Sequence, residues 1–138
     1  TRLEDAVTVA ALFVCLARML HRLRRNNQSW RTYPVFLLEE NRWRAQRYGL
    51  QGSLFDFGRG ELVPYADLLE EILAIIHEDA VALGCLEEVQ GARRILAEGT
   101  SADRQLACFA RAIESGATHQ EALNAVVDHL AAESCRGT

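Results

Sequence analysis

Apolar residues recur at helical spacing along most of the 138-residue chain, with one interruption. The spacing predicts helices over residues 1–25, 35–48, 66–84, 86–99, 101–115 and 119–133. Residues 53–57 and 61–63 lose this spacing and favour two short strands around a Gly-Arg-Gly turn. We therefore expect a mostly α fold: a bundle-like layer of about six helices with one short β-hairpin.

The ends of several predicted helices carry recognisable signals. Thr1, Thr100 and Thr118 each begin a capping box, in which a threonine and an acidic residue three positions later satisfy the first backbone amides of a helix. Pro34 suits the first turn of the second helix. Gly49 follows that helix, where a left-handed stop is expected.

The first predicted helix is apolar nearly all the way round. Between Ala6 and Leu20 the main polar breaks are Thr8 and Arg18. Such a helix has to be covered on several sides, which is demanding for a chain of this length. Together with a first residue, Thr1, that is not Met, this helix leads us to expect a piece of a larger protein.

Charge is distributed unevenly along the chain. The formal charge is −4, and lysine does not occur. Residues 18–47 hold eight arginines and two glutamates, a charge of +6, which leaves −10 for the remainder. The acidic remainder argues against a nucleic-acid partner, although a local basic patch keeps RNA binding open as a third interpretation. The longest apolar run, residues 9–17, is too short to span a bilayer, and no signal peptide is seen, so we expect a cytoplasmic protein without a membrane anchor.

The sequence contains no cluster with the spacing of a metal site or a catalytic triad. The four cysteines are Cys15, Cys85, Cys108 and Cys135. They form no CxxC pair, and we expect buried free thiols in a reducing compartment. His77, Glu78 and Asp79 are adjacent, but neighbours on a helix point about 100° apart, so we expect a solvated helix end there.

The stretch NRWRAQRYGLQG, residues 41–52, combines three arginines with two aromatic residues before its glycines. On a helix, Arg44 and Tyr48 share a face, as do Trp43 and Arg47. Three interpretations stay open from these residues alone. They are an Arg–aromatic face that closes one domain on another, an anion-binding site, and an RNA contact.

The segment ENRWRAQRYGLQGSLFDFGRGELVP, followed by a helix and then ILAEGTSADRQL, closely resembles the C-terminal part of the type 2 glutamate–cysteine ligase family. These are bacterial ATP-dependent carboxylate–amine ligases. TRLEDAVTVAAL is similar to the helix that follows an Arg-bearing strand in that family. The resemblance runs in order from Thr1 to about Glu133, and its most specific pattern is NRW-A-RYGL-G.

The resemblance implies that residues 1–138 are the C-terminal helical portion of an α+β, glutamine synthetase-like ligase. In that family, the nucleotide and divalent metals bind acidic side chains on an antiparallel sheet, which lies upstream of the segment present here. ATP and Mg²⁺ are thus implied for the parent enzyme, with no cofactor or metal ligand expected in this chain alone. The family reaction forms an amide: ATP phosphorylates a carboxylate, and an amine attacks the acyl phosphate. The isolated chain is expected to be inactive.

The family-like motif includes Asn41, Arg42, Arg47 and Tyr48. The resemblance implies that an arginine here can bind a substrate carboxylate or a phosphate oxygen. Arg47 is the first candidate, because RYG is the part most firmly associated with the family, and Arg44 is not singled out. Each residue can instead serve to dock the helical layer on the catalytic sheet.

The resemblance also implies partners. These are the upstream catalytic sheet of the same protein, a small-molecule carboxylate and an amine, and a second copy of the chain, since an uncovered apolar helix favours self-association. The alternative is a standalone helical protein-interaction domain that binds through the first helix without catalysis. Strands with paired glutamates directly upstream in the gene would favour the ligase, and a start codon there would favour the alternative.

Overall fold

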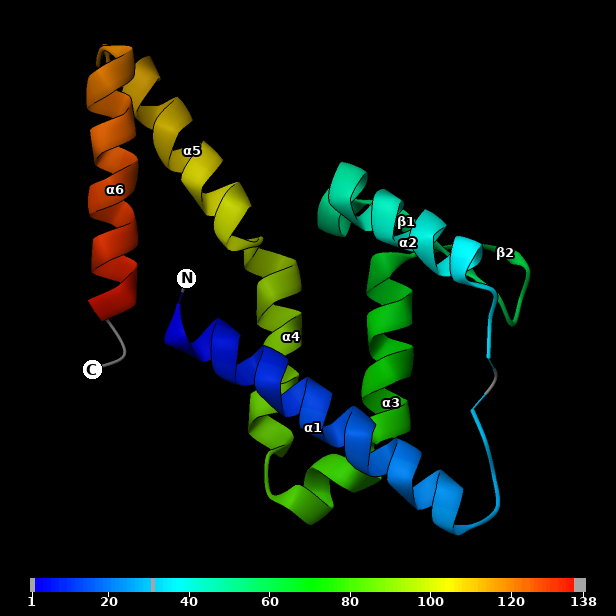
Figure 1. Ribbon diagram of the computed structural model, residues 1–138. Helices are drawn as coiled ribbons and strands as arrows, with labels where there is room; N and C mark the ends of the chain where they lie inside the picture. Colours follow the sequence, from blue (N-terminus) through cyan, green and yellow to red (C-terminus); the bar gives the residue numbers. More distant parts are fainter. Residues whose placement is uncertain (1, 31, 136–138) are drawn as a thin grey trace. The chain divides into compact units, whose positions relative to one another are not determined.

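Figure 1 shows the computed structural model of the protein, in which residues 2–30 and 32–135 are described. The elements are α1 Leu3–Arg25, α2 Val35–Tyr48, the 3-10 turn η1 Gly49–Gln51, β1 Ser53–Asp56, β2 Glu61–Pro64, α3 Tyr65–Leu83, α4 Leu86–Glu98, α5 Ser101–Glu114 and α6 His119–Cys135. The prediction of a mostly helical chain with one hairpin is confirmed. Predicted and observed boundaries agree to within about two residues, as expected where helix ends carry capping signals.

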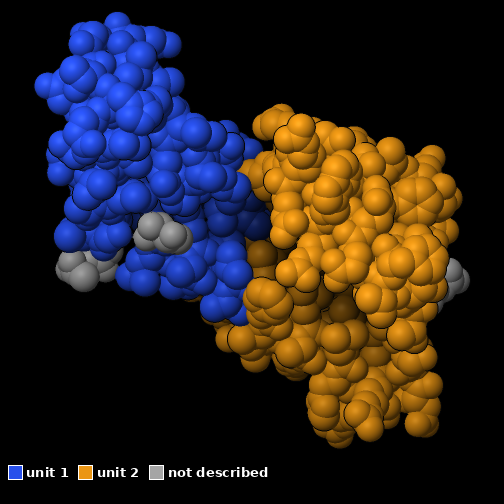
Figure 2. Space-filling model, turned by 45° about the horizontal axis from the view of Figure 1, so that its top comes forward, with its two compact units in different colours: residues 1–10, 90–138 blue, residues 11–89 orange. Residues whose placement is uncertain are grey.

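The chain forms two compact units, coloured separately in Figure 2. One unit comprises residues 1–10 and 90–138, and the other comprises residues 11–89. The helices α1 and α4 each contribute to both units, because each crosses a boundary between them.

The unit of residues 11–89 is organised around the hairpin and α3. The strands β1 and β2 pair antiparallel, in a register that runs from Ser53 opposite Pro64 to Asp56 opposite Glu61. α2 packs against β1, and α3 follows directly from β2. The buried apolar side chains of this unit include Cys15, Met19, Val63, Leu69, Leu73, Ile76 and Ala80. They come from α1, β2 and α3, so these elements share one core.

In the unit of residues 1–10 and 90–138, α5 and α6 form a helical hairpin and lie side by side in Figure 1. Ala122 on α6 is fully buried. The start of α1 packs closely on α4, because a Cβ atom added to Gly91 would lie only 2.2 Å from the hydroxyl oxygen of the buried Thr8. A glycine at this helical position therefore permits the close approach of the two helices.

Two of the three predicted capping boxes are confirmed. The amide of Thr100 donates to the Asp103 carboxylate at 2.7 Å, and the Asp103 amide donates back to the threonine hydroxyl at 3.3 Å. Thr118 and Glu121 make the same exchange at the start of α6, also at 2.7 and 3.3 Å. The third box begins at Thr1, which lies outside the described residues.

A glycine with a positive φ directly follows each of α2, α3 and α4. Gly84, after α3, has φ 68° and ψ 27°, which is the left-handed conformation that commonly stops a helix. Gly49, after α2, has the expected positive φ of 58°, but its ψ of −148° lies outside the left-handed helical region. The chain therefore leaves α2 through the short turn η1 and enters β1 four residues later.

Both α1 and α2 leave apolar surface exposed. α1 buries Cys15 and Met19 on one face, while Phe13 on another is 70% exposed and Leu20 is 48% exposed. α2 has no buried residue, and its Phe36 is 70% exposed. The prediction that α1 is apolar on more sides than its own chain covers is confirmed.

Candidate functional site

Asn41 attaches α2 to β1. Its side-chain nitrogen donates to the carbonyl oxygen of Phe55 at 2.9 Å, and the Phe55 amide donates to the Asn41 side-chain oxygen at 2.7 Å. Two hydrogen bonds to one backbone residue reproduce the exchange that a neighbouring antiparallel strand would make. The amide of Asn41, a predicted site residue, is thus engaged by the hairpin.

Arg44 makes a second attachment one turn later. Its Nε donates to the carbonyl oxygen of Ser53 at 2.9 Å, and its guanidinium lies 5.6 Å from the centre of the Tyr48 ring. The predicted shared face of Arg44 and Tyr48 is confirmed. Trp43 packs edge-on against Tyr48, with ring centres 5.7 Å apart. Arg44, which the family resemblance does not single out, therefore anchors α2 to the hairpin.

Arg42 and Arg47 take no part in this attachment. The Arg42 side chain is 69% exposed and lies 3.6 Å from the carboxylate of Glu39 on the same helix. Arg47 is exposed, and it forms no hydrogen bond or ion pair with any residue that the structure describes. The two arginines are five positions apart, which places them on different sides of α2.

The four predicted site residues therefore do not lie on one face of α2. Asn41 and Tyr48 share the face of α2 that meets β1 and η1, because residues seven apart lie one above the other on a helix. Arg42 and Arg47 stand on other sides and are open to solvent. Contact of any of the four with a ligand remains a prediction.

An apolar hollow of about 340 Å³ adjoins Asn41. Its lining includes the aromatic residues Trp30, Tyr33, Phe55, Phe57 and Tyr65. The ring centres of Tyr33 and Phe57 lie 4.8 Å apart, so part of this lining packs on itself. The carboxylates of Asp56 and Glu71 also line the hollow. Both pair with the guanidinium of Arg59, Asp56 at 3.2 Å and Glu71 at 3.0 Å.

Asp79 on α3 corrects the prediction of a solvated helix end. It is fully buried, and its carboxylate accepts hydrogen bonds from Arg18 at 2.6 Å and from Arg22 at 2.8 Å. The adjacent Glu78 is 73% exposed and lies 3.6 Å from Arg22. The prediction failed for Asp79 because its partners come from α1, which sequence spacing on α3 cannot show.

The hydrogen bond from Arg22 is the main cause that holds the pKa of Asp79 below its ordinary value of 3.8. Burial opposes this effect, and the hydrogen bond from Arg18 adds to it. Asp79 is therefore a buried carboxylate that stays ionised because two guanidiniums face it.

A second set of ion pairs stabilises the unit of residues 1–10 and 90–138. Asp5 accepts hydrogen bonds from Arg94 at 2.9 Å and from Arg104 at 3.0 Å. Glu133 accepts from Arg104 at 2.9 Å and from Arg2 at 3.0 Å. Burial raises the pKa of Glu133, but the hydrogen bonds and charges of Arg104 and Arg2 outweigh it, so this pKa lies below its ordinary value. The arrangement links α1, α4, α5 and α6 and has the character of a structural network.

The cysteines differ from the prediction of four buried thiols. None of the four forms a disulfide with a described residue, but only Cys15 is buried, whereas Cys85 and Cys108 are half-buried and Cys135 is exposed. The Sγ atoms of Cys15 and Cys85 lie 3.4 Å apart. Burial, and then the contact with Cys85, raise the pKa of the Cys15 thiol to about 11, so this thiol is protonated at neutral pH.

Residues 2–30 and 32–135 contain neither a metal-ligand cluster nor a membrane-spanning helix. No three histidine, cysteine, aspartate or glutamate side chains gather there at the spacing of a metal site. No helix within the same residues combines the length and apolar character needed to cross a bilayer.

The family model described as glutamate–cysteine ligase family 2 matches residues 1–129 of the chain. The chain belongs to glutamate–cysteine ligase family 2. The resemblance carried by the NRW-A-RYGL-G pattern is thereby confirmed. In this family member the motif, residues 41–52, lies on α2 and on the turn η1 that leads to β1.

Three similar proteins share the name "Putative glutamate–cysteine ligase 2". The protein from Rhodospirillum rubrum is 63% identical over 134 residues, which is 97% of this chain. The protein from Jannaschia sp. is 50% identical over 129 residues, or 94% of this chain. The protein from Sorangium cellulosum is 46% identical over 137 residues, or 99% of this chain.

In each of these three comparisons the matched part is 34% of the relative's own length. The chain therefore spans about a third of the length of the relatives it matches. No solved structure matches it. The role of the part of these relatives that the chain does not match is therefore a proposal.

Proposed function

We propose that this chain is the helical part of an ATP-dependent carboxylate–amine ligase of the glutamate–cysteine type. In the proposed reaction, ATP phosphorylates a substrate carboxylate, and an amine attacks the acyl phosphate to form an amide and release phosphate. The proposal rests on family membership over residues 1–129. It is supported by the fact that the chain spans only about a third of its relatives.

The exposed faces of α1 and α2 are the structural observation that carries the proposal furthest. Phe13 on α1 and Phe36 on α2 are each 70% exposed. At about 25 cal/mol per Å² of apolar surface removed from water, covering such faces would contribute several kcal/mol. We assign this role to a catalytic sheet in the rest of the ligase. An isolated chain with these faces uncovered is expected to self-associate.

Arg47 is the residue we assign to ligand contact. Its guanidinium is exposed and makes no hydrogen bond or ion pair with the described residues, so it is available to a carboxylate or a phosphate oxygen. Arg42 is a second candidate, weakened by its proximity to Glu39. Asn41 and Tyr48 act by holding α2 on the hairpin, which fixes the position of both arginines.

The described residues fit only part of the implied cofactor set. A guanidinium such as that of Arg47 suits the phosphates of ATP, which supplies the phosphoryl group when bound. Mg²⁺ requires several oxygen ligands, and the described residues bring no such group together. The proposal therefore places the metal ligands elsewhere in the ligase and predicts that this chain alone does not turn over ATP.

The test is ADP formation by the longer ligase in the presence of Mg²⁺, with glutamate and cysteine supplied together and separately. The proposal predicts that ADP forms with an amide product only when a carboxylate and an amine are both present. If ADP release did not depend on either substrate, the proposed reaction would be wrong. If the protein released no ADP with a wide panel of acids and amines, the interaction-domain alternative would be favoured.

A further inference from the structure

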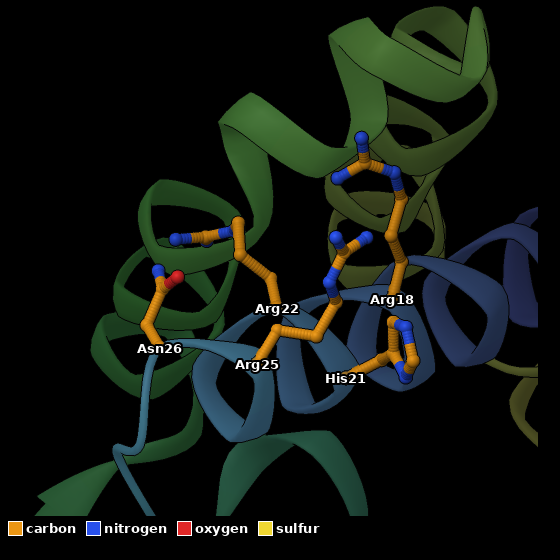
Figure 3. A pocket seen from close by; sticks show the side chains of 5 residues that line it. All are labelled: Arg18, His21, Arg22, Arg25 and Asn26. Atoms are coloured by element: carbon orange, nitrogen blue, oxygen red, sulfur yellow. The ribbon is translucent and has the colours of Figure 1, made fainter.

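The C-terminal end of α1 carries a cationic pocket that the proposed reaction does not use. The pocket has a volume of about 480 Å³ and lies in the unit of residues 11–89. It is lined by Arg18, His21, Arg22, Arg25 and Asn26. Figure 3 shows that the side chains of Arg18 and Arg25 extend from α1 in the same direction. The spacing of residues 18, 21, 22 and 25 explains the shared face, since positions three and four apart are neighbours on a helix.

The lining contains three guanidiniums, an imidazole and an amide, and no carboxylate. Asp79 and Glu78 pair with two of the guanidiniums, those of Arg18 and Arg22. The side chain of Arg25 forms no hydrogen bond or ion pair with the residues that the structure describes, and it is exposed. The three guanidiniums together with the carboxylates of Asp79 and Glu78 therefore carry a net charge of +1.

Asp79 fixes the positions of two arginines that line this pocket. Its buried carboxylate holds the guanidiniums of Arg18 and Arg22 by different oxygen atoms, at 2.6 and 2.8 Å. The Arg18 and Arg22 side chains are nevertheless 38% and 32% exposed, so N–H donors remain open to solvent. Arginines oriented before a ligand arrives lose less side-chain freedom on binding than free ones. Guanidiniums held in this way suit an oxyanion, which accepts paired N–H donors.

We propose that this pocket binds a small, multiply charged oxyanion, of the phosphate or polycarboxylate class, between Arg25 and the pair held by Asp79. The volume accommodates a small molecule, and the unpaired charge of Arg25 is complementary to it. The site is separate from the α2 motif, because none of its lining residues belongs to that motif. The inference goes beyond the proposed ligase activity and does not depend on it.

The test is a titration of the 138-residue chain with inorganic pyrophosphate at constant ionic strength, followed by the NMR signals of the His21 ring and by calorimetry. We expect saturable binding, and Arg25→Gln should weaken it roughly tenfold, the effect of losing one charged hydrogen bond. Arg24→Gln is the matched control, because it removes the same charge from an adjacent exposed residue that does not line the pocket. Far-UV circular dichroism establishes that each variant keeps its helices.

Three results would overturn the proposal, and each would have a different explanation. Equal weakening by Arg24→Gln and Arg25→Gln would show a general basic field, and absence of saturation would show no site. Binding of heparin without binding of pyrophosphate would indicate a polyanion surface of the nucleic-acid-binding type. A parallel titration with citrate identifies the source of the oxyanion: tighter binding of pyrophosphate assigns a phosphate, and tighter binding of citrate assigns a carboxylate. Arg47→Ala should leave the response of the His21 ring signals unchanged, because Arg47 does not line this pocket.

Discussion

The arginines of α1 and those of α2 differ in what holds them. On α1, Arg18 and Arg22 are fixed by the fully buried carboxylate of Asp79. On α2, Arg44 is fixed by a backbone carbonyl of the hairpin, while Arg47 has no partner among the described residues. Arginine thus serves in an internal ion pair at Arg18 and Arg22 and as an available cation at Arg47. The exposed side chain of Arg25, at the end of α1, resembles that of Arg47 in this respect.

The difference shows why arginine content alone does not locate a binding surface. A guanidinium paired with a buried carboxylate contributes to folding, and its removal is expected to affect stability first. A guanidinium without a partner contributes little to folding, so its removal is expected to affect binding or catalysis first. The variants Asp79→Asn, Asn41→Ala and Arg47→Ala separate these two effects, with a decreasing expected change in the free energy of unfolding.

The largest change is expected for Asp79→Asn. The substitution removes the charge that faces Arg18 and Arg22, and we expect a loss of about 2 kcal/mol, reduced by solvent screening because both guanidiniums are partly exposed. Urea unfolding followed by circular dichroism measures it. The matched control is Glu78→Gln, an adjacent residue whose side chain is 73% exposed and which should change stability by less than about 0.5 kcal/mol. Equal effects of the two variants would contradict the assignment of Asp79 as the buried anchor.

The pH dependence of stability should report the same anchor. The pKa of Asp79 in the folded protein lies below its ordinary value of 3.8, so its contribution is present above about pH 4 and is lost as the pH falls through the folded value. Glu133 acts in the same direction, because its pKa is also lowered. We expect the unfolding midpoint in urea to fall in acid, and to fall less steeply in Asp79→Asn. Identical slopes in the two proteins would show that Asp79 is not linked to folding.

A smaller change is expected for Asn41→Ala. The variant loses both hydrogen bonds to the backbone of Phe55, and we expect a destabilisation of about 1 kcal/mol. The backbone groups of Phe55 can turn to water once Asn41 is shortened, which keeps the loss below that of Asp79→Asn. The control is Gln46→Ala on the same helix, an exposed position where little change is expected. A neutral Asn41→Ala would return this residue to the list of ligand-binding candidates.

The smallest change is expected for Arg47→Ala. Its side chain has no intrachain partner among the described residues, so the free energy of unfolding should move by less than about 0.5 kcal/mol. Arg44→Ala is the comparison, since Arg44 bonds to Ser53 and lies over Tyr48. It should be the more destabilising of the two in the same urea experiment. The reverse order would place Arg47 in the fold and Arg44 outside it.

The sequence predicted the elements well because helix ends are encoded locally. Thr100 with Asp103 and Thr118 with Glu121 lie three residues apart, so the chain itself shows the cap. Asp79 could not be predicted in the same way, because its two partners are 61 and 57 residues away in the chain. The amide of Asn41 likewise meets a backbone group 14 residues away, which only the packing of α2 on β1 shows. The family pattern identified the motif but could not separate the residues that dock α2 from those that remain free.

The most direct test of this account is the ATP turnover of the longer ligase proposed above, carrying Arg47→Ala and measured beside its urea unfolding midpoint. We predict that turnover falls at least roughly tenfold, the effect of losing one charged contact to a ligand, while the midpoint stays that of the parent protein. Gln46→Ala, one position away on α2, should retain full turnover. Unchanged turnover in Arg47→Ala would contradict the assignment of this free guanidinium to the ligand.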